Sequence, residues 1–459
     1  IRDRHLDTFI QLAEQGFEEL HGSNDLIWIE KLETENDNFR TALSWSLESP
    51  ELDPQKALQL SGALLDFWDT RGYTSEGVQW LIDALKQAPG TPTGQRCRAL
   101  LGAGLLCARI SQNKNASLYF EDALNLASQL NIEPLIIRSL GLSSDVMEDR
   151  EEARKRSEKS IALARTTQNQ YYLAESLGWW AMTYSDNTPD TIRCIEEAFE
   201  IAEKLGNARL HAFILWEYGG IEMRRANHDV ATSMIQEALN LGQLLKDRHL
   251  TAHCLLMLGR TATRQAIYDA AIQYEDESLQ IFRDLSDRTC STNCIFHIGW
   301  NAFLAGDTRQ AVQRFDECLS LSHEIDNIEL MSMPTFALGR IAIMHGDIHK
   351  SKGFLLEALD SHKKVPDSLY YLAYCLEAVC AIPGIPSNQA ARLLGKAEAI
   401  REQKGYVLPI AERHLVDPII ERLQSLLGKE AFDSARIEGK ALTIEQVIDD
   451  AIKVVQIIE

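Results

Sequence analysis

Most of the chain consists of paired apolar stretches in which hydrophobic residues recur with the period of an α-helix. A short polar break separates the two stretches of a pair, as at Ala305-Gly306-Asp307 and at His345-Gly346-Asp347. Only 12 of the 459 residues are proline, so few positions would interrupt a helix. The pattern therefore predicts an all-α protein built from helical hairpins.

The hairpins repeat every 40 residues. Glycine recurs at this interval at Gly219, Gly259, Gly299 and Gly339. A small residue follows twelve positions after each glycine (Ala231, Ala271, Ala311, Ser351) and another nineteen positions after it (Ala238, Ser278, Cys318, Ala358). Half a period, less a turn, corresponds to a helix of roughly 17 residues. Because one hairpin cannot bury its apolar faces and stacked neighbours can, we expect a right-handed α-solenoid.

The same offsets extend in both directions along the chain and define about nine hairpins over residues 54–404. We expect residues 1–53 to form an N-terminal helical pair at the junction with an upstream module. Residues 405–459 are expected to form a C-terminal helical cap. The chain starts at Ile1 rather than at methionine, so we also expect it to be part of a longer protein.

The spacing of the small residues resembles the tetratricopeptide repeat, in which a Leu-Gly pair is followed by alanines twelve and nineteen positions later. Leu258-Gly259 and Leu338-Gly339 are such pairs, and Phe120 and Phe315 match the aromatic position of that pattern. The family's usual period is about 34 residues, so a period of 40 implies longer hairpins. The resemblance implies that the first helix of each hairpin lines a concave groove.

A second resemblance comes from the two ends of the chain. Trp28, Leu32 and the run at 35–45 near the start, with Ala390 to Ala399 and Ala411-Glu412-Arg413 near the end, are similar to the sensor region of STAND-class signal-transduction ATPases. These bacterial proteins include AfsR-like and LuxR/MalT-like regulators. The resemblance implies a cytoplasmic, non-enzymatic arm that receives an inducer, peptide or protein and contacts and controls an attached ATPase. The alternative is a free-standing scaffold or adaptor that binds peptide tails.

Composition and charge exclude several classes of function. The chain has 46 Lys and Arg against 67 Asp and Glu, a net charge of −21, which would repel the phosphates of a nucleic acid. It has no run of about 18 apolar residues that would indicate a membrane helix. The nine cysteines are odd in number and scattered through apolar helical stretches, as expected of reduced, buried thiols in the cytoplasm.

The sequence lacks the motifs of common enzymes. No Gly-x-x-x-x-Gly-Lys-Ser/Thr loop, His-Glu-x-x-His helix or Gly-x-Ser-x-Gly elbow is present, so we expect no catalytic activity and no cofactor. Cys290, Cys294 and His297 have a spacing that would let them approach one metal ion on a helix. Buried thiols on a packing face are the favoured interpretation, and we expect no metal.

Candidate ligand-binding residues follow from the helical period. The positions that share the groove face with each glycine collect aromatic rings and arginines across residues 180–340. They are Trp180, Tyr184, Trp216, Arg224, His253, Arg260, Arg264, Asn293, Phe296, Trp300 and Arg340. Rings and guanidinium groups are typical of binding hot spots, and arginine pairs well with carboxylates and phosphates. We therefore expect a protein or peptide ligand with acidic or phosphorylated groups. Packing of the rings between hairpins is the alternative.

Two residues are candidates for the junction with an upstream module. Asn36, Asp37 and Asn38 fall in a stretch expected to lie in the middle of a helix, where these residue types are unfavourable. A compensating contact is therefore expected, in which Asn38 and Arg40 tie the helix to the preceding module or to the first hairpin. An ordinary polar helix face is the alternative.

Overall fold

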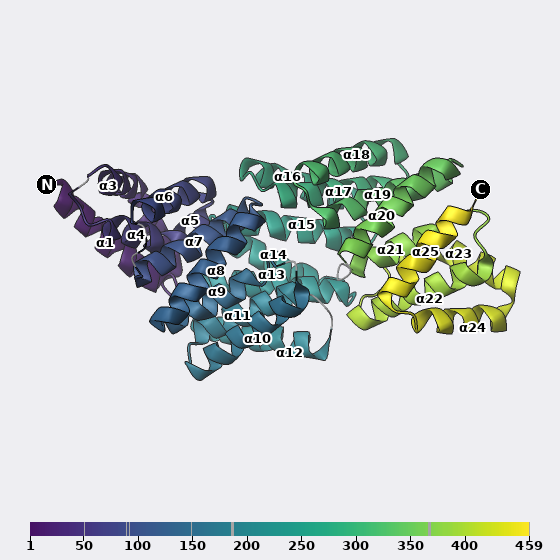
Figure 1. Cartoon of the computed structure of the whole chain (residues 1–459), viewed down its shortest axis with the longest axis horizontal. Helices are drawn as coiled ribbons and strands as arrows, with labels where there is room; N and C mark the ends of the chain where they lie inside the picture. Colours follow the sequence, from purple (N-terminus) through teal and green to yellow (C-terminus); the bar gives the residue numbers. More distant parts are fainter. Residues whose placement is uncertain are drawn as a thin grey trace. The chain divides into compact units, whose positions relative to one another are not determined.

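The computed structural model describes residues 1–49, 51–88, 90, 92–147, 149–184, 188–365 and 369–458, except for the side chain of Tyr184. These residues form 25 α-helices and one 3₁₀ helix, with no β-strand among them (Figure 1). The predicted all-α solenoid of helical hairpins is therefore confirmed.

The helices, in chain order, are α1 (Arg2–Glu19), α2 (Asp25–Thr34), α3 (Asn36–Glu48), α4 (Gln55–Ala63), α5 (Leu65–Arg71), α6 (Thr74–Gln87), α7 (Gly94–Arg109), α8 (Asn113–Leu130), α9 (Glu133–Ser143), α10 (Arg150–Thr166), α11 (Gln170–Tyr184), α12 (Pro189–Leu205), α13 (Ala208–Arg224), α14 (His228–Leu245), α15 (Arg248–Arg264), α16 (Tyr268–Asp284), α17 (Arg288–Leu304), α18 (Thr308–Glu324), α19 (Ile328–Met344), α20 (Ile348–Lys364), α21 (Leu369–Cys380), α22 (Ser387–Lys404), η1 (Ile410–Glu412), α23 (Arg413–Leu427), α24 (Lys429–Lys440) and α25 (Ile444–Ile457).

The 40-residue period is visible in where the helices begin. First helices of successive hairpins start at Ala208, Arg248, Arg288 and Ile328, and second helices start at His228, Tyr268, Thr308 and Ile348. Seven of these eight helices contain 17 residues, and α14 contains 18. The turn inside each of these hairpins uses one left-handed residue, with φ of 64° at Ala226, 61° at Ala266, 90° at Gly306 and 76° at Gly346.

The glycine column marks where the two helices of a hairpin approach most closely. A Cβ atom at Gly219 would lie 2.5 Å from Ile235 Cγ1, and one at Gly339 would lie 2.8 Å from Leu355 Cγ. Both distances are well inside van der Waals contact. The helix-to-helix spacing of each hairpin therefore depends on the missing side chain.

The chain divides into two compact units. The first unit comprises residues 1–221, 229–254 and 281–287, and the second comprises residues 222–228, 255–280 and 288–459. In the second unit, α17 packs against α18 and α19, and α19 packs against α20 and α21 (Figure 1). This order is that of stacked hairpins, in which each buries the apolar face of the next.

Contacts between parts of the chain that lie far apart in the sequence stabilise the first unit. Asn207, in the turn before α13, donates from Nδ2 to the backbone oxygens of Leu20 (2.9 Å) and Gly22 (2.7 Å). The backbone N–H of Arg209 donates to Asp25 Oδ2 at 2.8 Å. Hydrogen bonds therefore join α1 and α2 to a hairpin that lies more than 180 residues later in the sequence.

The first unit also contains a buried group of charged residues. Arg138 is 2% exposed and donates to Asp66 at 2.8 Å and to Glu175 at 3.2 Å. Arg209 lies 3.4 Å from Asp66 and 3.1 Å from Asp69. Burial alone would raise the pKa of Asp66, but the charges of Arg138 and Arg209 outweigh it and hold this pKa well below its ordinary value. Each buried charge of this group therefore has an opposite charge beside it.

The N-terminal segment differs from the expected helical pair because it contains three helices, α1, α2 and α3. Glu35 separates α2 from α3, because its backbone, with φ of −98° and ψ of 7°, is not helical. Asn36 and Asp37 therefore occupy the first turn of α3 rather than the middle of a helix. An acidic side chain is favourable in the first turn of a helix. The prediction that these residues are unfavourable for helix formation was therefore wrong.

The C-terminal part consists of η1, α23, α24 and α25, of which α24 packs against α22. Gly395 of α22 and Gly439 of α24 lie at their crossing. A Cβ atom at Gly395 would collide with the Arg436 carbonyl oxygen, and one at Gly439 with the Arg392 carbonyl oxygen. The two helices therefore touch through their backbones, which fixes α24 on the last hairpin.

A pair of glycine substitutions in one hairpin tests the packing role of the glycine column. We expect Gly339→Ala to destabilise the chain by about 1 to 3 kcal/mol, because the new Cβ displaces Leu355. The matched control is Gly353→Ala in α20, where nothing lies within 4 Å of the new Cβ. That change should stabilise by about 0.5 to 1 kcal/mol, since alanine favours the helix. Urea unfolding measures both, and equal effects would contradict this account.

Asp247 predicts a pH dependence of stability. Its side chain caps α15 by accepting from the Leu250 N–H at 2.8 Å, and burial raises its pKa from 3.8 to about 6. Between these values the folded state binds more protons than the unfolded state, so stability falls as the pH rises. Asp247→Asn keeps the cap and removes the charge. We expect the variant to be more stable than the wild type by roughly 1 to 3 kcal/mol at pH 8 and equally stable at pH 4. Thermal unfolding at both pH values measures this, and a constant difference would contradict it.

Candidate ligand-binding site

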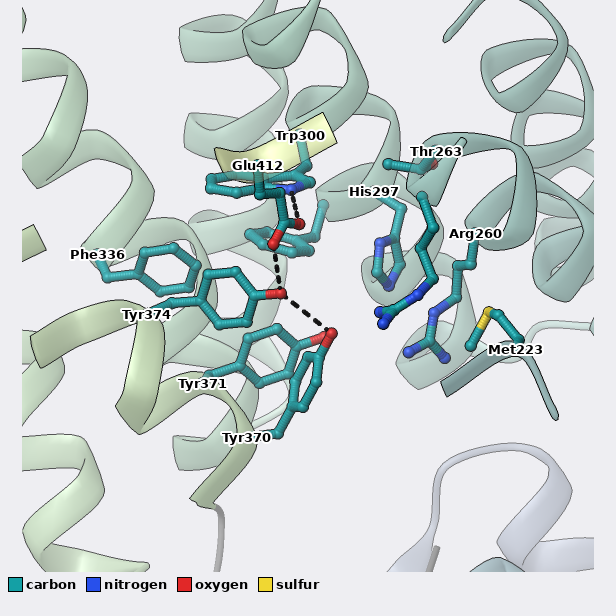
Figure 2. Close-up of a pocket in the computed structure, with 12 residues that line it drawn as sticks. Met223, Arg260, Thr263, His297, Trp300, Phe336, Tyr370, Tyr371, Tyr374 and Glu412 are labelled. Atoms are coloured by element: carbon teal, nitrogen blue, oxygen red, sulfur yellow. Dashed lines mark hydrogen bonds between the residues drawn. The ribbon is translucent and has the colours of Figure 1, made fainter. Parts of the chain in front are cut away.

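A pocket within the second unit is lined by first helices of successive hairpins and by the segment that follows α22 (Figure 2). It is formed by α13, α15, α17, α19, α21 and η1. The residues around it are Met223, Arg260, Thr263, Arg264, Phe296, His297, Trp300, Phe336, Tyr370, Tyr371, Tyr374 and Glu412. The repeat and the segment after it thus bring together side chains that lie up to 189 positions apart.

One wall of the pocket is aromatic. The rings of Phe296 and Trp300 are stacked with centroids 6.1 Å apart, and those of Phe336 and Tyr374 are stacked at 5.8 Å. Tyr371 lies against Phe336 at 6.2 Å. Trp300 and Phe336 are 4% and 1% exposed, so part of each ring belongs to the core. The wall is therefore rigid, and its packing fixes the orientation of the rings.

The opposite wall carries two arginines of α15, Arg260 and Arg264. Figure 2 shows Arg260 across the pocket from Tyr370 and Tyr371. Arg264 is buried and donates from Nη2 to the Val407 backbone oxygen at 2.7 Å. The half-buried guanidinium of Arg260 forms no hydrogen bond or ion pair with any residue that the structure describes. Since a partly desolvated cation gains from an anionic partner, this is the group best placed to receive one.

A buried carboxylate lies at the aromatic wall. Glu412 is 5% exposed and accepts hydrogen bonds from Trp300 Nε1 at 3.1 Å and from the Tyr374 hydroxyl at 2.8 Å. The Tyr370 hydroxyl lies 3.2 Å from that of Tyr374 (Figure 2). Burial raises the pKa of Glu412, while the hydrogen bond from Tyr374 and the charge of Arg264 act in the opposite direction. The pocket thus already accommodates one carboxyl group.

The pocket is narrow in this conformation. Its empty space is about 410 Å³ including the part open to solvent, but only about 30 Å³ is wide enough for the centre of a water molecule. That is room for about two water molecules. A ligand larger than one functional group would therefore require the lining residues to move.

The structure distributes the predicted groove residues between the two units. Four of them, Arg260, Arg264, Phe296 and Trp300, line the pocket. Arg224, Asn293 and Arg340 belong to the second unit but do not line it, and Trp180, Trp216 and His253 belong to the first unit. The side chain of Tyr184 lies outside the described residues.

The predicted residues outside the pocket contact other parts of their own unit. Arg340 is 5% exposed and donates to the Leu415 backbone oxygen at 3.2 Å. In the first unit, the ring of Trp216 lies 4.7 Å from that of His253. Burial and the neighbouring His249 lower the pKa of His253 well below its ordinary value, so this ring is uncharged at neutral pH. The role of these residues in binding a ligand stays a prediction.

Sequence reasoning missed the tyrosines and Glu412. Tyr370, Tyr371 and Tyr374 are spaced three and four apart, so they share one face of α21, and this spacing could have indicated them. They do not fall on the positions that the glycine column selects. Glu412 follows the last hairpin, where the repeat gives no register.

Neither a metal site nor a membrane span is found in the part of the chain that the structure describes. Cys294 is fully buried with its sulfur 3.5 Å from Ser278 Oγ, and His297 lines the pocket. No group of three His, Cys, Asp or Glu side chains among the described residues is arranged to hold a metal ion. None of the described helices is both long and apolar enough to cross a bilayer.

Comparison with known proteins agrees with the repeat architecture. Residues 210–284 match the model of the tetratricopeptide repeat family. Proteins of Mycobacterium tuberculosis and Mycobacterium bovis, whose names propose HTH-type transcriptional regulators, are 25% identical over 220 residues. The aligned part is 45% of this chain and 24% of those relatives, so the chain spans about a quarter of their length.

Solved structures show the same fold. A Rap protein complexed with Competence and Sporulation Factor aligns with a TM-score of 0.53 and 13% identity, over 79% of this chain and 99% of its own. A STAND protein with a tetratricopeptide repeat sensor from Pyrococcus horikoshii aligns at a TM-score of 0.41 and 13% identity, over 73% of this chain and 53% of its own. The second value does not distinguish one helical solenoid from another. The chain is thus a tetratricopeptide-like α-solenoid.

Proposed function

We propose that this chain is a non-enzymatic sensing and protein-interaction domain that binds an acidic group of a peptide, protein or small inducer in the pocket of the second unit. The observation that carries the proposal is Arg260, a half-buried cation without a bonded partner among the described residues, facing aromatic rings (Figure 2). Binding then regulates a STAND-type NTPase to which the domain is attached.

The net negative charge of the chain supports a ligand-binding role for Arg260. With 67 acidic residues against 46 basic ones, an arginine has many carboxylates available as partners, and Arg138 is paired in this way. A guanidinium group binds carboxylates and phosphates through two parallel hydrogen bonds, and nearby rings add contact area. A carboxylate or phosphate of the ligand therefore fits this position.

The comparisons support a regulatory role for such a domain. The mycobacterial relatives carry the name of transcriptional regulators and are about four times as long as the aligned segment. The Rap protein of similar fold was crystallised with Competence and Sporulation Factor. In a solenoid, each hairpin packs on its neighbours, so closure of a pocket around a ligand would change the stacking and couple binding to an attached module.

We also propose that residues 1–53 connect the repeats of residues 54–404 to the NTPase, and that residues 405–459 cap them. Arg40 of α3 donates from Nε and Nη2 to both carboxylate oxygens of Glu76 in α6, each at 2.7 Å. Asn38 is exposed and donates to Glu35 at 2.6 Å. Arg40 thus holds α3 on the first hairpin, and the exposed face around Asn38 is left for the NTPase.

The test of this function is binding of acidic peptides to the whole chain. Fluorescence anisotropy compares a panel of labelled peptides rich in Asp and Glu with the same peptides carrying Asn and Gln. We expect only the acidic set to bind. Arg260→Ala should weaken that binding by about 1.5 to 3 kcal/mol, the usual value of a hydrogen bond to a charged group. Its melting temperature should stay close to that of the wild type, because Arg260 has no hydrogen bond or ion pair among the described residues to lose and acts on Glu275 only through its charge.

Two control variants separate binding from folding. Arg309→Ala removes an exposed arginine of α18 and should change neither affinity nor stability. Arg340→Ala removes the hydrogen bond to Leu415 and a buried side chain, so it should lower the melting temperature. Equal binding of the acidic and amide peptides, or an unchanged affinity in folded Arg260→Ala, would contradict the proposed function.

A further inference from the structure

The segment between α22 and α23 consists of four residues without regular secondary structure, followed by the 3₁₀ helix η1, and it lies against the arginines of the pocket. Residues 406–409 have no regular secondary structure, and Pro409 has φ of −61° and ψ of 147°, which is extended backbone. Gly405 ends α22 in a left-handed conformation with φ of 66°, which turns the chain toward the pocket. Tyr406 then lies against Tyr370 with ring centroids 5.0 Å apart.

The backbone of this segment is bound by arginine positions of the first helices. The Val407 oxygen accepts from Arg264 Nη2 at 2.7 Å, and the Val407 N–H donates to the Arg224 backbone oxygen at 3.5 Å. Beyond the segment, in the first turn of α23, the Leu415 oxygen accepts from Arg340 Nη1 at 3.2 Å. Main-chain hydrogen bonds to groups spaced along a groove are how proteins hold extended peptides.

The side chain of Glu412 completes the resemblance to a bound peptide. Its carboxylate fits between Trp300 and Tyr374, both of which donate to it (Figure 2). The charge of Arg264 stabilises it more than that of Arg401 does. Proteins bind the acidic side chain of a ligand in this way, with the carboxylate buried among rings and accepting two hydrogen bonds.

The segment is held by these polar contacts and by two small buried side chains. Val407 and Ile410 are 47% and 78% exposed, whereas Pro409 is buried and Ala411 is 4% exposed. A segment that buries so little apolar surface opens at a lower free energy than the helices beside it. It can therefore leave the wall without unfolding the hairpins.

We propose that residues 406–412 form a strap that occupies the ligand site, and that the ligand is an extended acidic peptide that displaces it. The peptide would place a backbone oxygen on Arg264 and a carboxylate between Trp300 and Tyr374. A second acidic group would bind Arg260, which the strap leaves without a bonded partner among the described residues. This inference rests on the proposed function and adds the class of partner and its regulation.

The strap lowers the apparent affinity of a peptide because it competes within the same molecule. A short tethered segment acts at an effective concentration on the order of millimolar. The apparent dissociation constant equals the intrinsic one divided by the fraction of molecules that are open. Weakening the strap without altering the wall should therefore strengthen binding of an external peptide.

The test uses a labelled synthetic peptide with the sequence of residues 405–415 and the full chain in two forms, wild type and Glu412→Ala. The substitution removes the strap's carboxylate and leaves Trp300, Tyr374 and Arg264 in place. We expect Glu412→Ala to bind the peptide about tenfold more tightly than the wild type does, a change of about 1.4 kcal/mol. A second peptide, with glutamine at the position of Glu412, should not show this tenfold increase in affinity.

Controls keep the result interpretable. Glu421→Ala removes an exposed carboxylate of α23 and should leave the affinity at the wild-type value. If Glu412→Ala does not fold, Glu412→Gln replaces it, since it keeps the shape and should give a smaller gain. An unchanged affinity in a folded Glu412 variant, or no binding of the peptide to either form, overturns the strap.

The outcome also separates this inference from the proposed function. If acidic peptides bind through Arg260 and the Glu412 variants have no effect, the pocket is a ligand site without a strap. If the strap peptide binds the Glu412 variant more tightly while Arg260→Ala leaves the affinity for acidic peptides unchanged, the strap is supported and the role of Arg260 is contradicted.

Discussion

Close approach of the two helices in each hairpin is the constraint on which the rest of this structure depends. At Gly219, Gly259, Gly299 and Gly339 any side chain would meet the second helix of the same hairpin within 3 Å. The glycines set the spacing of the helices and keep successive hairpins in the same register. Arg260 and Trp300, at equivalent positions 40 residues apart, consequently line the same pocket from opposite walls.

Both units contain buried ion pairs, Arg138 with Asp66 in the first and Arg401 with Glu377 in the second, and Arg260 differs from them. In the first unit, Arg138 is enclosed by Asp66 and Glu175, an arrangement that holds the helices in one geometry. In the second unit, Arg264 is bonded to a backbone oxygen and Arg260 has no bonded partner among the described residues. A paired charge stabilises a fold only when both partners stay in place, whereas an unpaired charge beside rings is suited to a ligand that comes and goes. The contrast is why we assign binding to the second unit.

The sequence predicted the helical hairpins that repeat and missed the residues that lie outside the repeats. Its period indicated the hairpins, and the helices begin at Ala208, Arg248, Arg288 and Ile328 as a 40-residue repeat requires. The period also selected four of the residues around the pocket. It could not indicate Glu412, because this residue reaches the wall through a segment outside the repeats whose path depends on tertiary contacts. Position within a helix was also uncertain near the N-terminus, where a single residue divides α2 from α3.

The central claim is that a ligand binds in the pocket between α15, α17 and α21, in place of the segment at 406–412. Hydrogen exchange of the full chain, measured by mass spectrometry with and without a bound acidic peptide, tests it most directly. The account predicts slower exchange in the peptides that cover α15 and α21 and faster exchange across residues 406–412, as the segment leaves the wall. Protection confined to the first unit, or slower exchange at 406–412, would contradict it.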